Sequence, residues 1–512
     1  MSGKWRYVFW GLFWGIAFSI AYTQSPLYTS NQNQYFLHGL ARANFGLINE
    51  DWLSSTLDPT PAFSLFVELT FRFLHPIFFY IFYAILLGLY LLSVLMIVES
   101  SRIKQASNSH NWIFLSIILV IHSAGWRFGL SRILGPDWGY ILEDGFAGQR
   151  LLGPVLQPST FGVLLLLSIV FFLRKHPFTA IFFAGLAATI HPTYLFGAAC
   201  LVFVYMFETF RDKKGADFLQ RIRKPIFMGL FGFLVVAPIL VLSYKNFGIT
   251  PLETTAQAQN ILVNFRIPHH AIVKEWFGLT SIIKLSLLFI ALFLIRQTKL
   301  FLLLLIPSIF SLIMTMIQIL TGSDFLALLF PWRVSVLLIP LSVGIIIDRT
   351  LSKVFELHFL NLQKTKYAFL SISFFMVLMA VIVGSIRLGL DFRRQLIEPE
   401  RPLYAWVSDN RDSGQIYLTP IKMQDFRLAT GAPVFIDFKS IPYQDEDVLE
   451  WYRRVNLVMD FYNFPTCRKI KKLSDEENIT QVILPSQNHL DNCGVLVLEY
   501  ADDGYQLLSV SP

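Results

Sequence analysis

Long apolar runs are the feature that most constrains what this chain can fold into. They fall near residues 7–23, 76–98, 112–128, 159–173, 178–190, 193–208, 225–244, 278–295, 299–320, 331–347 and 367–387. A helix of about 20 apolar residues crosses the hydrocarbon core of a bilayer. Hydrophobic residues make up 54% of the 512 residues and charged residues only 15%, too few to cover a soluble protein of this length. We therefore expect an all-α polytopic membrane domain over residues 1–390, with about eleven transmembrane helices.

The charged residues predict how these helices are oriented. Residues 1–390 carry 29 Lys and Arg against 16 Asp and Glu, whereas residues 391–512 carry 13 against 19. The basic residues gather in every second connection, including 99–111, 209–224 and 348–366. Positively charged connections stay on the cytoplasmic side. We expect an integral protein of the inner (plasma) membrane, with its N-terminus inside and residues 391–512 on the non-cytoplasmic side. The positive charge then reports orientation in the lipid bilayer, and no nucleic-acid partner is expected.

Residues 391–512 have the pattern of a small soluble α/β domain. The β-rich runs Gln415–Leu418, Pro433–Phe438, Gln481–Leu484 and Val495–Tyr500 alternate with helical stretches near 423–430 and 445–460. Cys467 and Cys493 both lie in this exported domain. An oxidising compartment would let them form a disulfide, although two free buried cysteines would give the same sequence.

The first external loop, residues 24–75, is long, and its apolar residues recur at helical spacing, as in helices that lie in the membrane interface. It contains the adjacent carboxylates Glu50 and Asp51. Such a pair can act as a general base or bind a divalent metal ion. A helix cap before Trp52 is the simpler explanation of the pair taken alone.

A second polar cluster lies at residues 126–158, between two predicted membrane helices. Polar groups there are costly unless they line an aqueous cavity. Arg150 could bind a phosphate in a bidentate manner, or it could pair with an aspartate and hold the loop. The remaining candidate ligands are Glu143, Asp144, His191, His269 with its neighbour His270, and Arg333. For the histidines, a hydrogen-bonded structural role is the alternative.

These features together resemble the GT-C superfamily of polyprenyl-phosphate-dependent glycosyltransferases. The segment Asn31–Pro61, the segment Gly148–Gly162, His191-Pro192-Thr193-Tyr194, and the stretch from Asp425-Phe426-Arg427 to Asp437-Phe438-Lys439 are similar to an uncharacterised family of bacterial membrane proteins with that architecture. The resemblance covers nearly the whole chain. In this chain the acidic pair has the order Glu-Asp and lies farther from the first span than in typical GT-C members.

The resemblance implies a membrane glycosyltransferase that moves a sugar from a polyprenyl-phosphate carrier to an acceptor at the non-cytoplasmic face of the cell envelope. Asp51 or Glu50 would take the acceptor's proton or hold a divalent metal ion. Arg150, with Arg333 or His191, would stabilise the departing phosphate. Helix centres nearly free of charge favour an enzyme over a transporter. A transporter or flippase of a lipid-linked glycan and a non-catalytic membrane assembly subunit remain alternatives.

Overall fold

The computed structural model describes residues 3–102, 107–212, 217–248, 250–356, 363–488, 490 and 493–511. Two compact units are present. The first consists of residues 1–24, 80–242 and 263–389, and the second of residues 25–79, 243–262 and 390–512. The division therefore differs from a single cut at residue 390, because residues 25–79, which include most of the loop predicted at 24–75, pack with the C-terminal residues.

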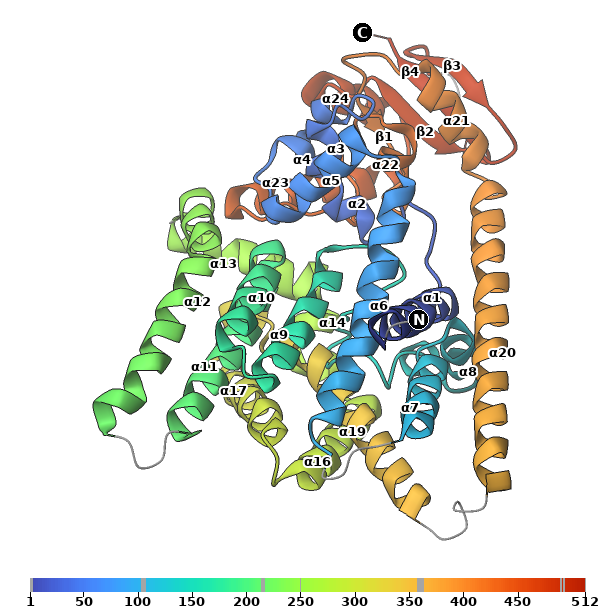
Figure 1. Ribbon diagram of the computed structural model, residues 1–512. Helices are drawn as coiled ribbons and strands as arrows, with labels where there is room; N and C mark the ends of the chain where they lie inside the picture. Colours follow the sequence, from blue (N-terminus) through green and yellow to red (C-terminus); the bar gives the residue numbers. More distant parts are fainter. Residues whose placement is uncertain are drawn as a thin grey trace. The chain divides into compact units, whose positions relative to one another are not determined.

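The first unit is helical (Figure 1). Its longer helices are α1 (Gly3–Tyr22), α6 (Ile77–Glu99), α7 (Asn108–Ile121), α8 (Ala124–Leu134), α9 (Val163–Leu173), α10 (Pro177–Ile190), α11 (Leu195–Asp212), α12 (Phe218–Asn246), α16 (Leu279–Ile295), α17 (Leu300–Thr321), α19 (Ser335–Glu356) and α20 (Gln363–Leu396). Its short helices are η2 (Pro136–Trp138), η3 (Pro158–Gly162), η4 (Pro192–Tyr194), the π-helix η5 (Ile261–Arg266), α14 (Pro268–Ala271), α15 (Val273–Trp276), α18 (Asp324–Leu328) and η6 (Pro331–Val334). Helices α6, α12, η5 and α20 extend across a boundary between the units.

Every predicted apolar run is helical, although 112–128 is divided between α7 and α8, and the number of spans is smaller than predicted. Among the described residues, six helices are long and apolar enough to cross a membrane, or seven if the bent pair α7 and α8 counts as one span. The apolar parts of α1, α9, α10 and α16 are only 10–17 residues long. At 1.5 Å per residue, a helix of that length falls short of a hydrocarbon core about 30 Å thick. The expected eleven is therefore corrected to six or seven, because an apolar run does not by itself set the length of the helix.

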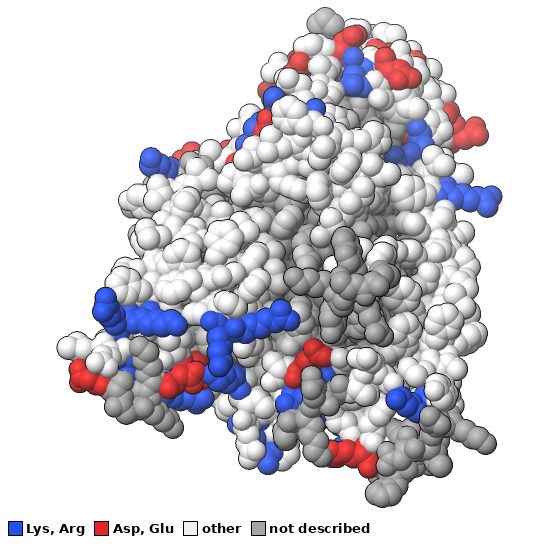
Figure 2. All heavy atoms as spheres, in the orientation of Figure 1, with Lys and Arg blue, Asp and Glu red and all other residues white. Residues whose placement is uncertain are grey.

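The long helices present apolar side chains to their surroundings. On α12, Leu230, Phe233 and Leu234 are each more than half exposed. Figure 2 shows broad uncharged surfaces, with Lys and Arg gathered near the ends of α11 and α12. Such surfaces are compatible with lipid rather than water as the surrounding medium.

The second unit combines helices with a small sheet (Figure 1). Its elements are α2 (Gln32–Tyr35), α3 (Leu37–Arg42), η1 (Ile48–Glu50), α4 (Trp52–Ser55), α5 (Pro61–Phe73), α13 (Leu252–Asn260), α21 (Arg401–Asn410), β1 (Tyr417–Leu418), α22 (Phe426–Thr430), α23 (Asp445–Asn463), α24 (Cys467–Glu477), β2 (Gln481–Pro485), β3 (Leu496–Ala501) and β4 (Tyr505–Val510). The strand order is β1-β2-β4-β3, with β1 parallel to β2 and the other pairs antiparallel. Its core includes Leu403, Tyr417, Phe426, Ile483 and Leu507.

The strands predicted for the C-terminal residues differ from the structure at two places, and helices α21 and α24 were not predicted. Pro433–Phe438 is no strand: only Val434 makes a bridge to Tyr417. The bridge is made by the carbonyl of Pro433 and the amide of Phe435, whereas the amide of Val434 donates to the carboxylate of Asp51 at 2.8 Å. Strand β4 was not predicted, although it lies at the centre of the sheet between β2 and β3.

Candidate functional site

The first unit is organised around a buried segment without regular structure, residues 139–157, which we call the central loop. Ile141, Phe146, Leu151 and Val155 are among its buried residues. Irregular backbone inside an apolar helical protein must find its hydrogen bonds within the protein. The helices around the central loop supply them.

Three side chains from different helices hold the central loop. Ser335 of α19 accepts a hydrogen bond from the amide of Phe146 at 2.8 Å. Lys284 of α16 donates to the carbonyl of Gly145 at 2.7 Å. Tyr83 of α6 accepts from the amide of Gly153 at 3.0 Å. These three hydrogen bonds fix the central loop. The sequence pattern of a single helix does not reveal such contacts.

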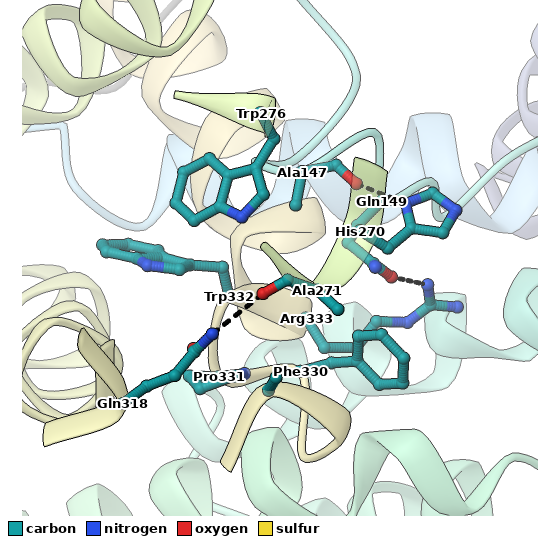
Figure 3. Close-up of a pocket in the computed structure, with 11 residues that line it drawn as sticks. Ala147, Gln149, His270, Ala271, Trp276, Gln318, Phe330, Pro331, Trp332 and Arg333 are labelled. Atoms are coloured by element: carbon teal, nitrogen blue, oxygen red, sulfur yellow. Dashed lines mark hydrogen bonds between the residues drawn. The ribbon is translucent and has the colours of Figure 1, made fainter. Parts of the chain in front are cut away.

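A pocket opens beside the central loop (Figure 3). Three aromatic side chains from two segments, Trp276 of α15 and Phe330 and Trp332 at the start of η6, form much of its wall. Its polar lining includes Gln149, His270, Gln318 and Arg333, and the amide of Gln318 donates to the carbonyl of Ala271 at 2.8 Å. Aromatic faces pack against the apolar faces of sugar rings, and a guanidinium group binds phosphate or carboxylate.

Arg333 is the cation of this pocket and is held by two neighbours. Its Nη1 donates to the amide oxygen of Gln149, and its Nη2 lies 3.1 Å from Nε2 of His191. Because a guanidinium can only donate, His191 accepts at Nε2 and carries its proton on Nδ1. The ring of Tyr194 lies 5.1 Å from the guanidinium carbon. The structure thus brings together Arg333 and His191, two residues singled out from the sequence.

His270 lines the pocket, whereas its neighbour His269 does not appear among the lining residues. The rings of the two histidines are 4.0 Å apart. Nδ1 of His270 lies 2.6 Å from the carbonyl oxygen of Ala147, so this nitrogen carries the proton. Burial, together with the neighbouring His269 and Arg333, lowers the pKa of His270 to about 4, against the opposing effect of its hydrogen bond to Ala147. His270 is therefore neutral near pH 7.

Two non-glycine residues of the pocket have left-handed backbone conformations. Ala147 has a φ of 53° and Phe330 a φ of 48°. Such conformations are uncommon for residues with a Cβ and cost about 1 kcal/mol or more each. The conformation of Ala147 places its carbonyl against His270. Phe330 directly precedes η6, the turn that carries Arg333. Strain of this kind tends to concentrate at functional sites.

The other end of the central loop carries the predicted acidic residues Glu143 and Asp144, both buried. Asp144 accepts from Nε of Arg150 at 3.0 Å, and the guanidinium of Arg150 stacks on Tyr140 at 3.6 Å. The predicted alternative of an Arg–Asp pair that holds the loop is therefore realised in the geometry. The Arg150 side chain remains 37% exposed.

The predicted pair Glu50 and Asp51 lies in the second unit. Asp51 is not a surface carboxylate, since it is only 2% exposed. Its Oδ1 caps α4 by accepting from the amide of Leu53 at 2.9 Å, as expected of a residue before Trp52. Glu50 accepts from Ser413 and from the amide of Gly414, and these hydrogen bonds lower the pKa of Glu50.

Asp51 belongs to a buried charge cluster that sequence reasoning missed. Its Oδ2 accepts from Nε of Arg427 at 2.7 Å, and Nη1 of Arg427 donates to Asp437. Asp437 in turn accepts from the amide of Ser440 at 2.7 Å. The pKa of Arg427 is raised by its two carboxylate partners in spite of burial. The sequence feature that could have indicated this cluster is Arg427, a charged residue within the otherwise apolar segment Phe426–Ala429.

Backbone contacts join the same segments of the second unit. The amide of Leu47 donates to the carbonyl of Gly431 at 2.7 Å. A Cβ on Gly46 would lie 2.4 Å from that carbonyl oxygen, so only glycine fits at this close approach. Residues 31–51 are therefore built into the same packing as residues 411–441.

The described residues contain the predicted disulfide but no cluster of side chains suited to a metal ion. Cys467 and Cys493 are joined by a disulfide, with a Cα–Cα distance of 5.4 Å. Across the described part of the chain, no three His, Cys, Asp or Glu side chains are grouped in a way that could hold a metal ion.

Comparison with known families finds a match in the C-terminal part of the chain. Residues 398–458 match a family described as a domain of unknown function (DUF6798). The match contains Arg427 and Asp437 but excludes Asp51, their partner from the first external loop. No curated protein matches the chain in sequence.

Proposed function

We propose that the protein is a GT-C-like membrane glycosyltransferase that moves a sugar from a polyprenyl-phosphate carrier to an acceptor at the non-cytoplasmic face of the inner membrane. The observation that carries the proposal is the pocket in which Arg333, oriented by Gln149 and His191, lies beside the aromatic side chains of Trp276 and Trp332. One cation suits the phosphate of the donor, and the aromatic faces suit its sugar ring.

In this proposal Arg333 binds the phosphate that departs with the lipid. Negative charge grows on that phosphate as the sugar–phosphate bond breaks, so a cation already in place stabilises the transition state more than the ground state. Gln149 and His191 are buried and accept hydrogen bonds from the guanidinium of Arg333, so they fix its orientation before the substrate binds. His270, neutral and with its proton on Nδ1, is available for hydroxyl groups of the sugar.

The proposed reaction does not use Asp51 as its base. Its two carboxylate oxygens accept from Leu53, Arg427 and Val434, which leaves little capacity for a proton from an acceptor. We assign Asp51 to the architecture of the second unit. Arg150 contributes through the central loop, because its Nε is already bonded to Asp144.

A transfer assay with purified protein in proteoliposomes tests the proposal. The probes are polyprenyl-phosphate-linked hexoses and pentoses, labelled in the lipid and supplied together with hydroxyl-bearing sugars and lipid-linked sugars as acceptors, and the readout is released polyprenyl phosphate. Wild-type protein should release it from at least one donor, and Arg333→Gln should reduce the rate about 100-fold or more. Release from none of the donors contradicts the proposal and favours the transporter or the assembly subunit.

A further inference from the structure

We infer that Nε2 of His270 accepts a hydrogen bond from the 2-hydroxyl group of the sugar that is transferred, and so makes the pocket selective for donors with a hydrogen-bond donor at that position. This inference rests on the proposed function and names the part of the sugar that the pocket recognises. His270 acts as a specificity-determining contact, and the inferred contact transfers no proton.

One short turn of the central loop holds both His270 and Arg333 (Figure 3). The carbonyl of Ala147 accepts from Nδ1 of His270 at 2.6 Å, and the amide oxygen of Gln149 accepts from the guanidinium of Arg333. These two anchors are two residues apart, so their Cα atoms are within about 7 Å. Gly148 lies between them with a φ of 61°, and a Cβ there would be only 3.4 Å from Cε1 of His270. The imidazole therefore packs directly on the turn that orients Arg333.

The imidazole of His270 offers one lone pair to a ligand. Because Nδ1 donates to the carbonyl of Ala147, Nε2 is the acceptor nitrogen. In the part of the chain that the structure describes, Nε2 makes no hydrogen bond. His270 lines the pocket and is partly exposed. An atom that can only accept selects a ligand group that donates, such as a hydroxyl.

The surrounding charges keep this lone pair available. The pKa of His270 is lowered to about 4, mainly by burial. His269, Arg333 and Arg266 also lower it, and the hydrogen bond to Ala147 opposes them. The imidazole is therefore neutral at pH 7 and accepts at Nε2. Since Arg333 is one of the groups that act on His270, its guanidinium lies close to the imidazole.

The position of His270 beside Arg333 selects one hydroxyl group of the sugar. In the donor, the phosphate is attached to the anomeric carbon, and C2 is the next carbon of the ring. The 2-hydroxyl is therefore the hydroxyl group closest to the phosphate. When Arg333 binds the phosphate, this hydroxyl is the one best placed to reach a side chain held by the same turn. Trp276 and Trp332, which line the same pocket, are left for the faces of the ring.

The inferred contact strengthens during the reaction. Positive charge develops at the anomeric carbon as the phosphate leaves, and it makes the neighbouring 2-hydroxyl a better hydrogen-bond donor. In the related hydrolysis of glycosides, hydrogen bonds to the 2-hydroxyl are stronger in the transition state than in the ground state. A neutral acceptor at Nε2 of His270 therefore raises kcat as well as selecting the substrate.

The test measures kcat/KM in the proteoliposome assay with three donors: the one that the wild type cleaves fastest, and its 2-deoxy and 3-deoxy analogues. His270→Asn keeps an amide donor for the carbonyl of Ala147 in place of Nδ1 but has no atom in place of Nε2. His270→Phe keeps a ring but lacks both nitrogens. His269→Phe is the matched control, because His269 is not among the residues that line the pocket.

Loss of the 2-hydroxyl should lower kcat/KM of the wild type about tenfold or more beyond its effect on either His270 variant, because only the wild type is left with an unpaired acceptor. Comparing the proteins cancels the effect that removal of the 2-hydroxyl has on the reactivity of the sugar itself. Loss of the 3-hydroxyl should have the same effect in all proteins to within about twofold. His269→Phe should discriminate among the donors as the wild type does.

Free polyprenyl phosphate, which lacks the sugar, separates the two contacts of the donor. Its inhibition constant for His270→Asn should lie within about threefold of the wild-type value, whereas Arg333→Gln should weaken inhibition about tenfold or more. Unchanged inhibition also shows that the His270 variant retains an intact phosphate site.

Equal discrimination against the 2-deoxy donor by the wild type and the folded His270 variants overturns this inference and leaves the proposed function intact. If neither variant folds, the wild type decides, since equal cleavage of its 2-deoxy and 3-deoxy donors also overturns the inference. A wild type that releases no polyprenyl phosphate from any donor overturns both the inference and the proposed function.

Discussion

Nε of Arg427 donates to Oδ2 of Asp51 at 2.7 Å, and neither side chain is more than 2% exposed. The two residues are 376 positions apart in the chain. Their pairing makes residues 25–79 an integral part of the unit that contains the C-terminal residues. The residues matched to DUF6798 supply only Arg427 and Asp437 of this cluster.

We predict that Asp51→Asn or Arg427→Met destabilises the protein by about 3 kcal/mol or more, because either change leaves a buried charge without its partner. A change at a surface carboxylate would instead alter the stability by only about 0–1 kcal/mol. The matched control is Arg453→Gln, which breaks exposed ion pairs with Glu450 and Glu477 and should cost no more than about 1 kcal/mol. Thermal unfolding of the detergent-solubilised chain checks this, and equal effects of the two kinds of variant would contradict it.

The sequence predicted what depends on local pattern and missed what depends on distant contacts. Each apolar run became a helix, because hydrophobicity and helix propensity act within about 20 residues. The partner of Asp51 could not be predicted, since nothing near Asp51 specifies Arg427. The same limit explains why Trp276 and Gln318 were not singled out for the pocket, whereas Arg333 and His191 stood out as polar residues beside apolar runs.

The disulfide gives a second prediction. Replacing Cys467 and Cys493 together by serine should lower the stability of the second unit by roughly 3 kcal/mol, because the bond closes a loop across a sequence separation of 26 residues. Cys200→Ser serves as the control, since that cysteine is free. Mass mapping without reduction should recover the Cys467–Cys493 peptide pair from native membranes, and finding both thiols free would contradict the prediction.

The orientation in the membrane is the third prediction. Reporter fusions after residues 60, 145, 260 and 450 should behave as non-cytoplasmic, and fusions after 105, 216 and 357 as cytoplasmic. The reason is the alternation of basic and acidic connections along the chain. This pattern requires the shorter helices α9, α10 and α16 to cross the membrane as well, because the six or seven long helices alone would not alternate in step with these fusions. A cytoplasmic signal from the fusion after residue 450 would remove the basis for a reaction at the non-cytoplasmic face.

The pH dependence of stability is the fourth prediction. Burial raises the pKa of Glu143 from 4.5 to about 7, so the folded state binds more protons than the unfolded state between these values. The contribution of this group is present below about pH 4.5 and is lost as the pH rises through about 7. Relative to Glu143→Gln, the wild type should lose on the order of 3 kcal/mol over that window.

Unfolding midpoints of both proteins from pH 4.5 to 8 measure this difference. A constant gap between wild type and Glu143→Gln across the range would show that the carboxyl group titrates as an ordinary exposed glutamate.

The central claim is that Arg333 binds the phosphate of a polyprenyl-linked sugar, and the most direct measurement is donor cleavage by wild type, Arg333→Lys and Arg333→Gln in the same proteoliposomes. Wild type should release polyprenyl phosphate. Arg333→Lys should keep the charge but lose the fork that engages Gln149 and His191, and so retain only part of the rate. Arg333→Gln should be about 100-fold slower than wild type. Equal release by all three proteins would contradict the account.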